Sequence, residues 1–280
     1  MPIRWAPITI ELELVQNLGD VCINLDDVAL GIDSSGATSG KPNTSAQWTI
    51  LNPVIKVDTV VLDSGLQNEY ANLLLSGTGI PISYSSFVTQ LQAISGQNVS
   101  VNVTRALSRL QSVFCSFDQA YTATKATYND THIAIWKKTF NDLFHPMSYN
   151  PTGNYDPNYE IEYQLQIGSN QYPQYPMRSL QECFYQLRKC MGTESSQFHS
   201  LDISPNEYRN HKHIIAFDTE KMLGSGFSGL NMKTGSHMTL KLKAANAATV
   251  TSAMMPDTVY LILHFDSILE IRDTGIMIYE

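Results

Sequence analysis

The chain has 280 residues, of which 43% are hydrophobic and only 16% charged, and it carries a net charge of −8. This length suits one large β domain or two small ones with an ample core. The negative charge and the absence of any run of lysine and arginine argue against a nucleic-acid groove. No stretch approaches the ~18 uninterrupted apolar residues of a membrane span, and the first residues, which include Glu11 and Glu13, lack the apolar region of a signal peptide.

The low charge is accompanied by abundant Ser, Thr, Asn and Gln. This composition is typical of a β protein whose exposed faces are polar but uncharged. It is also typical of a protein that packs against copies of itself, because desolvating charges at such contacts costs free energy. The cysteines show no metal-ligand spacing, and we interpret all of them as buried free thiols in a reducing compartment: Cys22, Cys115, Cys183 and Cys190.

Alternation of apolar and polar residues at period two predicts eight strands. In chain order they cover residues 8–14, 48–62, 82–94, 99–104, 159–167, 208–218, 237–243 and 259 onward. Pro53 indicates a bulge or a sheet edge in the second strand. The pattern leaves open whether the fourth strand continues through residues 113–117. In the last one, Gly275 turns or bulges the chain before its final apolar residues.

Two helices interrupt the strands. Ser179 and Glu182 form a capping box, in which their side chains satisfy backbone donors of the first turn of a helix over residues 179–191. Apolar residues recur behind the box at helical spacing, and Gly192 supplies the left-handed residue that ends the helix. A second helix is predicted over residues 66–75, ending at Gly77.

Two segments are predicted to be long loops. Residues 33–47 are rich in Gly, Ser, Thr and Asn and contain too few apolar residues to pack. An insertion at about 119–158 separates two predicted strands, and excursions of this length serve surface function or partner contact more often than the core. Together these elements predict an all-β fold over residues 1–280. It is a single domain, an eight-stranded jelly-roll sandwich with two short helices and long inter-strand loops.

Few residues indicate chemistry. His211 and His213 share one face of a predicted strand, and with Glu220 they are superficially similar to the metal motif of cupins. The gap to Glu220 is too long and the flanking glycines are missing, so two half-exposed strand histidines are the favoured interpretation. Residues 224–229 match G-x-G-x-x-G but lack the βαβ setting of a dinucleotide site, which indicates a flexible loop. We therefore predict no catalytic residues, no cofactor-binding residues, no metal ligands and no enzyme.

Six blocks of sequence, taken in order, resemble one family. They are RWAPITIELELV (4–15), VIKVDTVVLDSGLQNEYANLLLSG (54–77), TRALSRLQSVF (104–114), YQLQIGSNQYPQYPMRSLQECFYQLRKCMG (163–192), HIIAFDTEKMLGSGFSGLNMKTG (213–235) and VYLILHFDSILEIRDTGIMIY (259–279). The series resembles the major capsid proteins of polinton-like viruses, virophages and their relatives, the double jelly-roll lineage of tailless DNA viruses. Such proteins contain two jelly rolls in a longer chain, and these blocks resemble the C-terminal part.

The resemblance implies a structural protein of the virion, assembled inside the host cell, in the cytoplasm or the nucleus. It implies homotrimers that contact neighbouring capsomers in an icosahedral shell, with penton and minor capsid proteins as further partners and without direct nucleic-acid contact. Residues 33–47 and 119–158 are the loops expected to make such contacts. Three alternatives stay open: a penton or minor capsid protein with one jelly roll, a jelly-roll carbohydrate-binding module with Tyr-rich loops, and a cupin-like metal enzyme.

Overall fold

The computed structural model describes residues 6–12, 50–118, 154–192, 201–210, 212–219, 229–233 and 237–280. The chain divides into two compact units. One contains residues 1–84 and 267–279, and the other contains residues 85–266 together with Glu280. The single domain predicted over residues 1–280 stays a prediction, and residues 119–153 of its expected insertion lie outside the described residues.

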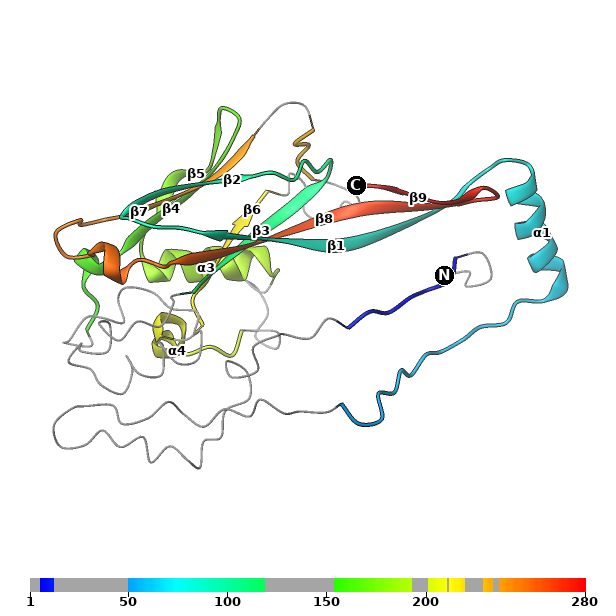
Figure 1. Cartoon of the computed structure of the whole chain (residues 1–280), viewed down its shortest axis with the longest axis horizontal. Helices are drawn as coiled ribbons and strands as arrows, with labels where there is room; N and C mark the ends of the chain where they lie inside the picture. The colour runs from blue at the N-terminus through cyan, green and yellow to red at the C-terminus, as the bar shows by residue number, and fades with distance from the viewer. Residues whose placement is uncertain are drawn as a thin grey trace. The chain divides into compact units, whose positions relative to one another are not determined.

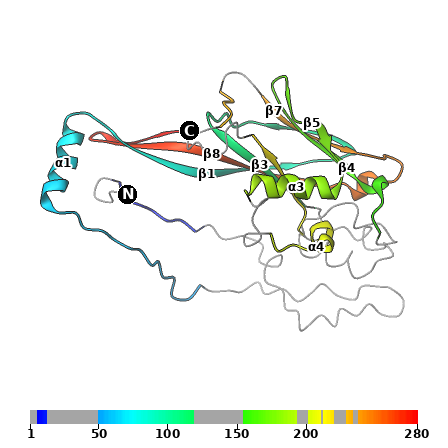
Figure 2. The same ribbon diagram turned by 180° about the vertical axis from the view of Figure 1, so that it is seen from behind.

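The described strands form two antiparallel sheets of a β sandwich (Figure 1). The five-stranded sheet has the order β1-β8-β3-β6, with β9 also paired to β8. Its strands are β1 (Ile80–Ala93), β3 (Leu110–Asp118), β6 (Ile214–Asp218), β8 (Thr258–Arg272) and β9 (Gly275–Tyr279). The four-stranded sheet has the order β2-β7-β4-β5, formed by β2 (Asn98–Val103), β4 (Ile161–Ile167), β5 (Asn170–Met177) and β7 (Met238–Ala244). Figure 2 shows β4, β5 and β7 side by side from behind.

Alternate residues of the central strands fill the core of the larger unit, the one that contains residues 85–266. In β7 the side chains of Met238, Leu240 and Leu242 are buried, while Thr239 and Lys241 between them are only partly covered. The same alternation runs through the first half of β8. The predicted all-β sandwich is therefore confirmed. The period-two pattern gives each sheet one apolar face, and the two apolar faces pack against each other.

Six of the eight predicted strands correspond to described strands, although the boundaries of one need correction. Those at residues 82–94, 99–104, 159–167, 237–243 and 259 onward match β1, β2, β4, β7 and β8. The turn expected near Gly275 separates β8 from β9. These two strands form an antiparallel hairpin, in which Ile268 pairs with Tyr279 at one end and Arg272 pairs with Gly275 at the other. The described residues thus form nine strands where the sequence predicts eight.

The two predicted N-terminal strands are wrong where the structure describes them. Residues 6–12 and 50–62 contain no paired strand, and most of their side chains are exposed. Both segments have the composition of strands, but strand formation also needs a neighbouring sheet edge that accepts the backbone hydrogen bonds. Residues 13–14 and 48–49 of these predictions lie outside the described residues, as does the predicted loop at 33–47.

Two further differences concern strand boundaries. The open continuation from residue 104 to 117 is not one strand, because β2 belongs to the four-stranded sheet and β3 to the five-stranded sheet. Strand β5 was not predicted, because Pro173 and Pro176 interrupt its pattern. It lies at the edge of its sheet, the position at which a strand tolerates proline.

Helix α3 (Leu180–Cys190) packs against β6 and confirms the predicted helix with its Ser179 cap, whereas Glu182 bonds to the residue before the cap instead of to the first turn. Ser179 Oγ accepts a hydrogen bond from the Glu182 backbone N–H at 3.1 Å, and the Glu182 carboxylate accepts one from the Arg178 N–H at 3.1 Å. Gly192 follows with a φ of 66°, the left-handed residue expected there. The second predicted helix is confirmed as α1 (Ser64–Leu75), and its first turn is capped by the Asp63 side chain.

Replacing Ser179 by alanine is expected to lower the free energy of unfolding by about 1 kcal/mol. The substitution removes the side chain that accepts the Glu182 N–H at the start of α3. Chemical denaturation of the variant measures this difference. Ser179→Asp is the matched control, since aspartate also caps helices, and a loss as large as that of alanine would contradict the capping role.

A short helix stands where the sequence predicts the start of a strand. Helix α4 (Pro205–Asn210) covers the first part of the predicted strand at residues 208–218, and β6 forms only the second part. Ser204 and Glu207 exchange hydrogen bonds with each other's backbone N–H at 3.2 and 2.9 Å, which is the reciprocal pattern of a capping box. Ser204, Pro205 and Glu207 are the sequence signal that predicts this helix, because proline is favoured in the first turn.

Candidate functional site

His213 is the described member of the predicted histidine pair, and it lies in the core. Its side chain is fully buried, and its Nε2 atom is 3.1 Å from the hydroxyl of Tyr163 on β4. The imidazole also stacks with Phe117 of β3 and meets the edge of the Tyr208 ring, with centroids 6.1 and 5.1 Å away. The sequence interpretation of a half-exposed strand histidine is therefore wrong in its burial. His213 joins both sheets through aromatic packing.

The other residues of the cupin-like motif give His213 no described metal partner. His211 and Glu220 lie outside the described residues, and Lys212 forms an ion pair of 3.1 Å with Glu207. Within the described ranges, no three His, Cys, Asp or Glu side chains gather as metal ligands would.

The described end of the G-x-G-x-x-G segment is tied to the sheet. The Leu230 N–H donates to the Leu110 carbonyl at 2.8 Å, and the Leu110 N–H donates back to Leu230 at 3.0 Å. A Cβ atom added to Gly229 would lie 2.6 Å from the backbone carbonyl carbon of Arg109. Glycine is therefore required at position 229 by this close approach of two backbones. Residues 224–228 lie outside the described residues.

Gly229→Ala is expected to destabilise the protein by about 1–3 kcal/mol, the usual cost of forcing extra atoms into a packed site. The backbone of Arg109 belongs to the turn before β3 and cannot move away as a flexible side chain can. Thermal unfolding of the variant measures the loss. Gly77→Ala is a suitable comparison, because no atom lies within 4 Å of a Cβ there and its φ of 80° isolates the conformational cost. Equal losses at both positions would contradict a steric role for Arg109.

The described cysteines agree in part with the prediction of buried thiols. Cys115 and Cys183 are buried and free, whereas Cys190 is only partly buried. Burial raises the pKa of the Cys115 and Cys183 thiols far above the usual range, because a thiolate would be desolvated there. Thiols held in the protonated form are poor nucleophiles. These two cysteines are therefore part of the packing.

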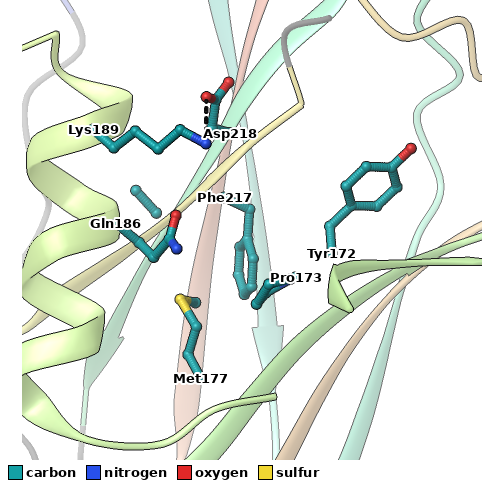
Figure 3. Close-up of a pocket in the computed structure, with 8 residues that line it drawn as sticks. Tyr172, Pro173, Met177, Gln186, Lys189, Phe217 and Asp218 are labelled. Atoms are coloured by element: carbon teal, nitrogen blue, oxygen red, sulfur yellow. Dashed lines mark ion pairs between the residues drawn. The ribbon is translucent and has the colours of Figure 1, made fainter. Parts of the chain in front are cut away.

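A small pocket of about 180 Å³ lies between β5, α3 and β6 (Figure 3). Its polar end is the ion pair of Lys189 and Asp218, whose Nζ and Oδ2 atoms are 3.4 Å apart, and Met177 lies at its other end. The volume is below the roughly 300–1,000 Å³ of ordinary ligand sites. The lysine and the carboxylate pair with each other at its polar end.

Exposed apolar side chains are the most prominent surface feature that the structure describes. In the smaller unit they occupy residues 8–12, residues 50–62 and strand β9. The extreme cases are Val60 and Val61, which are 84% and 87% exposed. In the larger unit Phe87 and Leu91 of β1 are each 61% exposed, on a strand without a charged residue.

No protein-family model matches the sequence, and no curated protein matches it significantly. Solved structures do resemble the fold. PBCV-1 VP54, in the crystal structure fitted into a cryo-EM reconstruction of the virophage Sputnik, matches with a TM-score of 0.44 and 11% identity, covering 78% of this chain and 55% of that chain.

Two further solved structures come from the same kinds of particle. The PBCV-1 virus capsid in its quasi-atomic model matches with a TM-score of 0.38 and 12% identity, covering 78% of this chain and 55% of that chain. The Sputnik virophage structure by cryo-EM matches with a TM-score of 0.34 and 11% identity, covering 71% and 38%. The chain thus spans about half, or less, of the length of the solved chains that it matches.

No helix in the described part of the chain combines the length and the hydropathy that a membrane crossing requires.

Proposed function

We propose that this chain is a structural protein of a viral capsid, a jelly-roll domain that forms homotrimers and acts in the virion by joining neighbouring capsomers. The exposed apolar and uncharged strand surface is the observation that supports this role most strongly. The series of sequence blocks that resembles double jelly-roll major capsid proteins supports it independently.

Rigidity and exposed contact surface are what a shell requires of its subunit. The core of the larger unit buries rings and aliphatic side chains from both sheets, which gives a stiff sandwich. Its outer strand β1 presents Phe87 and Leu91 without any charge. Neighbouring copies can therefore pair without desolvating ions, which keeps each repeated contact free of a large electrostatic penalty.

Light scattering coupled to size-exclusion chromatography tests this proposal on the whole chain. The expected mass is three times the 31.2 kDa of one chain, and electron microscopy of concentrated samples is expected to show regular arrays. The association is expected to persist in 1 M salt, because apolar contacts do not depend on ion pairing, whereas salt screens electrostatic clustering.

Other outcomes of the same measurement favour the alternatives. Five chains per particle would indicate a vertex protein. A monomer at every concentration would overturn the proposed assembly, and binding of that monomer to a glycan array would favour a carbohydrate-binding module.

A further inference from the structure

Strand β1 has an open edge. Among the described strands, β8 is its one hydrogen-bonded neighbour, and β1 lies at the end of the five-stranded sheet. Natural edge strands are usually short, bulged or charged, since an open edge is a template on which another strand can pair. β1 is 14 residues long and has no charged residue. It therefore lacks the ordinary protection of an edge.

Three contacts define how β1 faces β8. Ser85 Oγ donates to Asp266 Oδ1 at 2.9 Å, and the Phe87 ring stacks on His264 with centroids 4.6 Å apart. Just beyond the strand, the Ile94 N–H donates to the Asp257 carbonyl at 2.8 Å. These pairs follow a single antiparallel register, because each step forward along β1 corresponds to an equal step back along β8.

This register decides which backbone groups of β1 reach the open edge. In an antiparallel pair, alternate residues direct both N–H and C=O groups toward the partner strand. Ile94, directly after β1, bonds to Asp257, directly before β8. Continued along the same register, the even-numbered residues of β1 face β8 and the odd-numbered residues face the open edge. Pro81 has an odd number, so its missing N–H costs the sheet no hydrogen bond. The open edge offers the N–H groups of residues 83 to 93 at alternate positions.

A second element of the chain has strand character without a strand partner. Residues 54–62, VIKVDTVVL, consist mainly of β-branched residues and are exposed along their whole length. In the described structure none of residues 54–61 takes part in a hydrogen bond. The segment is bounded by Pro53 and by Asp63, which caps α1. Fully extended, it would span roughly 30 Å, which is shorter than β1.

We propose that residues 54–62 of one copy add to the open edge of β1 in a second copy, as an extra antiparallel or parallel strand. The inference rests on the proposed function and names the contact through which copies associate. Strand addition supplies the unpaired backbone groups of both elements with partners at once. The added strand would place Ile55, Val57 and Val61 on one face, where apolar residues such as Phe87 and Leu91 already stand exposed on β1.

Two proline variants of the whole chain test this contact. Every alignment of nine residues within the 14 of β1 includes Phe87, so Phe87→Pro removes an edge-facing N–H in all of them while leaving the bonds to β8 in place. The double substitution Val57→Pro with Val60→Pro removes an N–H donor that faces β1, whether the odd-numbered or the even-numbered residues of the segment face that strand. Phe87→Val, and Val57→Thr with Val60→Thr, are the matched controls, because they keep the N–H groups and place β-branched residues, which favour strands, at these positions.

We expect each proline variant to be monomeric by light scattering at concentrations at which the wild type and both controls associate. An equimolar mixture of the two proline variants is expected to form a particle of two chains. The edge-blocked copy still carries an intact segment, and the segment-blocked copy still carries an open edge.

Hydrogen exchange on the wild type gives a second readout that needs no variant. Amides of the odd-numbered residues of β1 are expected to exchange at least about tenfold more slowly in the associated state than in a dilute monomer, because strand pairing protects them. Amides of the even-numbered residues are expected to be protected in both states.

The possible failures are distinguishable. Unchanged association of Phe87→Pro, unprotected odd-numbered amides, or a mixture that stays monomeric overturns strand addition between copies and leaves the proposed function in place. A wild-type chain that never associates overturns the proposed function itself.

Discussion

Phe117→Ala is expected to lower the free energy of unfolding by about 3–5 kcal/mol, the largest loss for any single side chain considered for this protein. Phe117 is 1% exposed, and its ring stacks on Tyr163 and His213 with centroids 5.7 and 6.1 Å away. It stands on β3, whereas Tyr163 stands on β4 of the other sheet. Its removal therefore opens a cavity between the two layers. Denaturant unfolding monitored by circular dichroism measures the effect.

The exposed Phe87 provides the matched control for this prediction. It loses the same atoms on replacement by alanine, but it is 61% exposed and its ring stacks on that of His264. Its replacement is expected to cost less than about 1 kcal/mol. Similar losses at Phe87 and Phe117 would mean that the interior between the sheets is not packed as described.

Arg178→Met is expected to cost about 2–3 kcal/mol, because it removes the cation from a buried carboxylate. The Glu160 side chain is 3% exposed and accepts a hydrogen bond from Arg178 Nε at 2.6 Å, with a second from the Tyr155 hydroxyl. The arginine is itself 47% exposed, so the loss falls short of that for a fully buried pair. Replacing Glu160 by glutamine in the same chain is expected to recover part of it, since the neutral amide needs no cation.

Lys243→Met is the control for this ion pair. Lys243 is 62% exposed and pairs with Glu162, two residues from Glu160, at 3.3 Å. An exposed pair of this kind contributes less than about 1 kcal/mol. A loss at Lys243 equal to that at Arg178 would show that burial of the carboxylate is not the reason for the difference.

Local patterns were sufficient for several elements of this fold. The alternation in β7 and the first half of β8 predicts strands because a residue's side of the sheet depends only on its position along the strand. Ser179 and Gly192 mark both ends of α3 because capping involves residues within one turn. The capping box of Ser204 and Glu207 is also local, so α4 was predictable although a strand was assigned there.

Contacts between distant residues decided the candidate site. The sequence interval from Tyr163 to His213 gives no sign that their side chains meet, and only the packing of the two sheets brings them together with Phe117. The half-exposed strand histidine predicted at position 213 was therefore wrong. A strand pattern does not reveal which of its faces another layer covers.

The sequence by itself determined the all-β class, the two longer helices with their caps, and most of the strands, because each depends on periodicity or on neighbours within a few residues. Only the tertiary structure decided that residues 50–62 pair with no described strand, that β8 is the one described strand beside β1 and that His213 lies in the core. The physical reason is that an isolated strand leaves its backbone groups without partners, so its fate depends on which distant edge it meets.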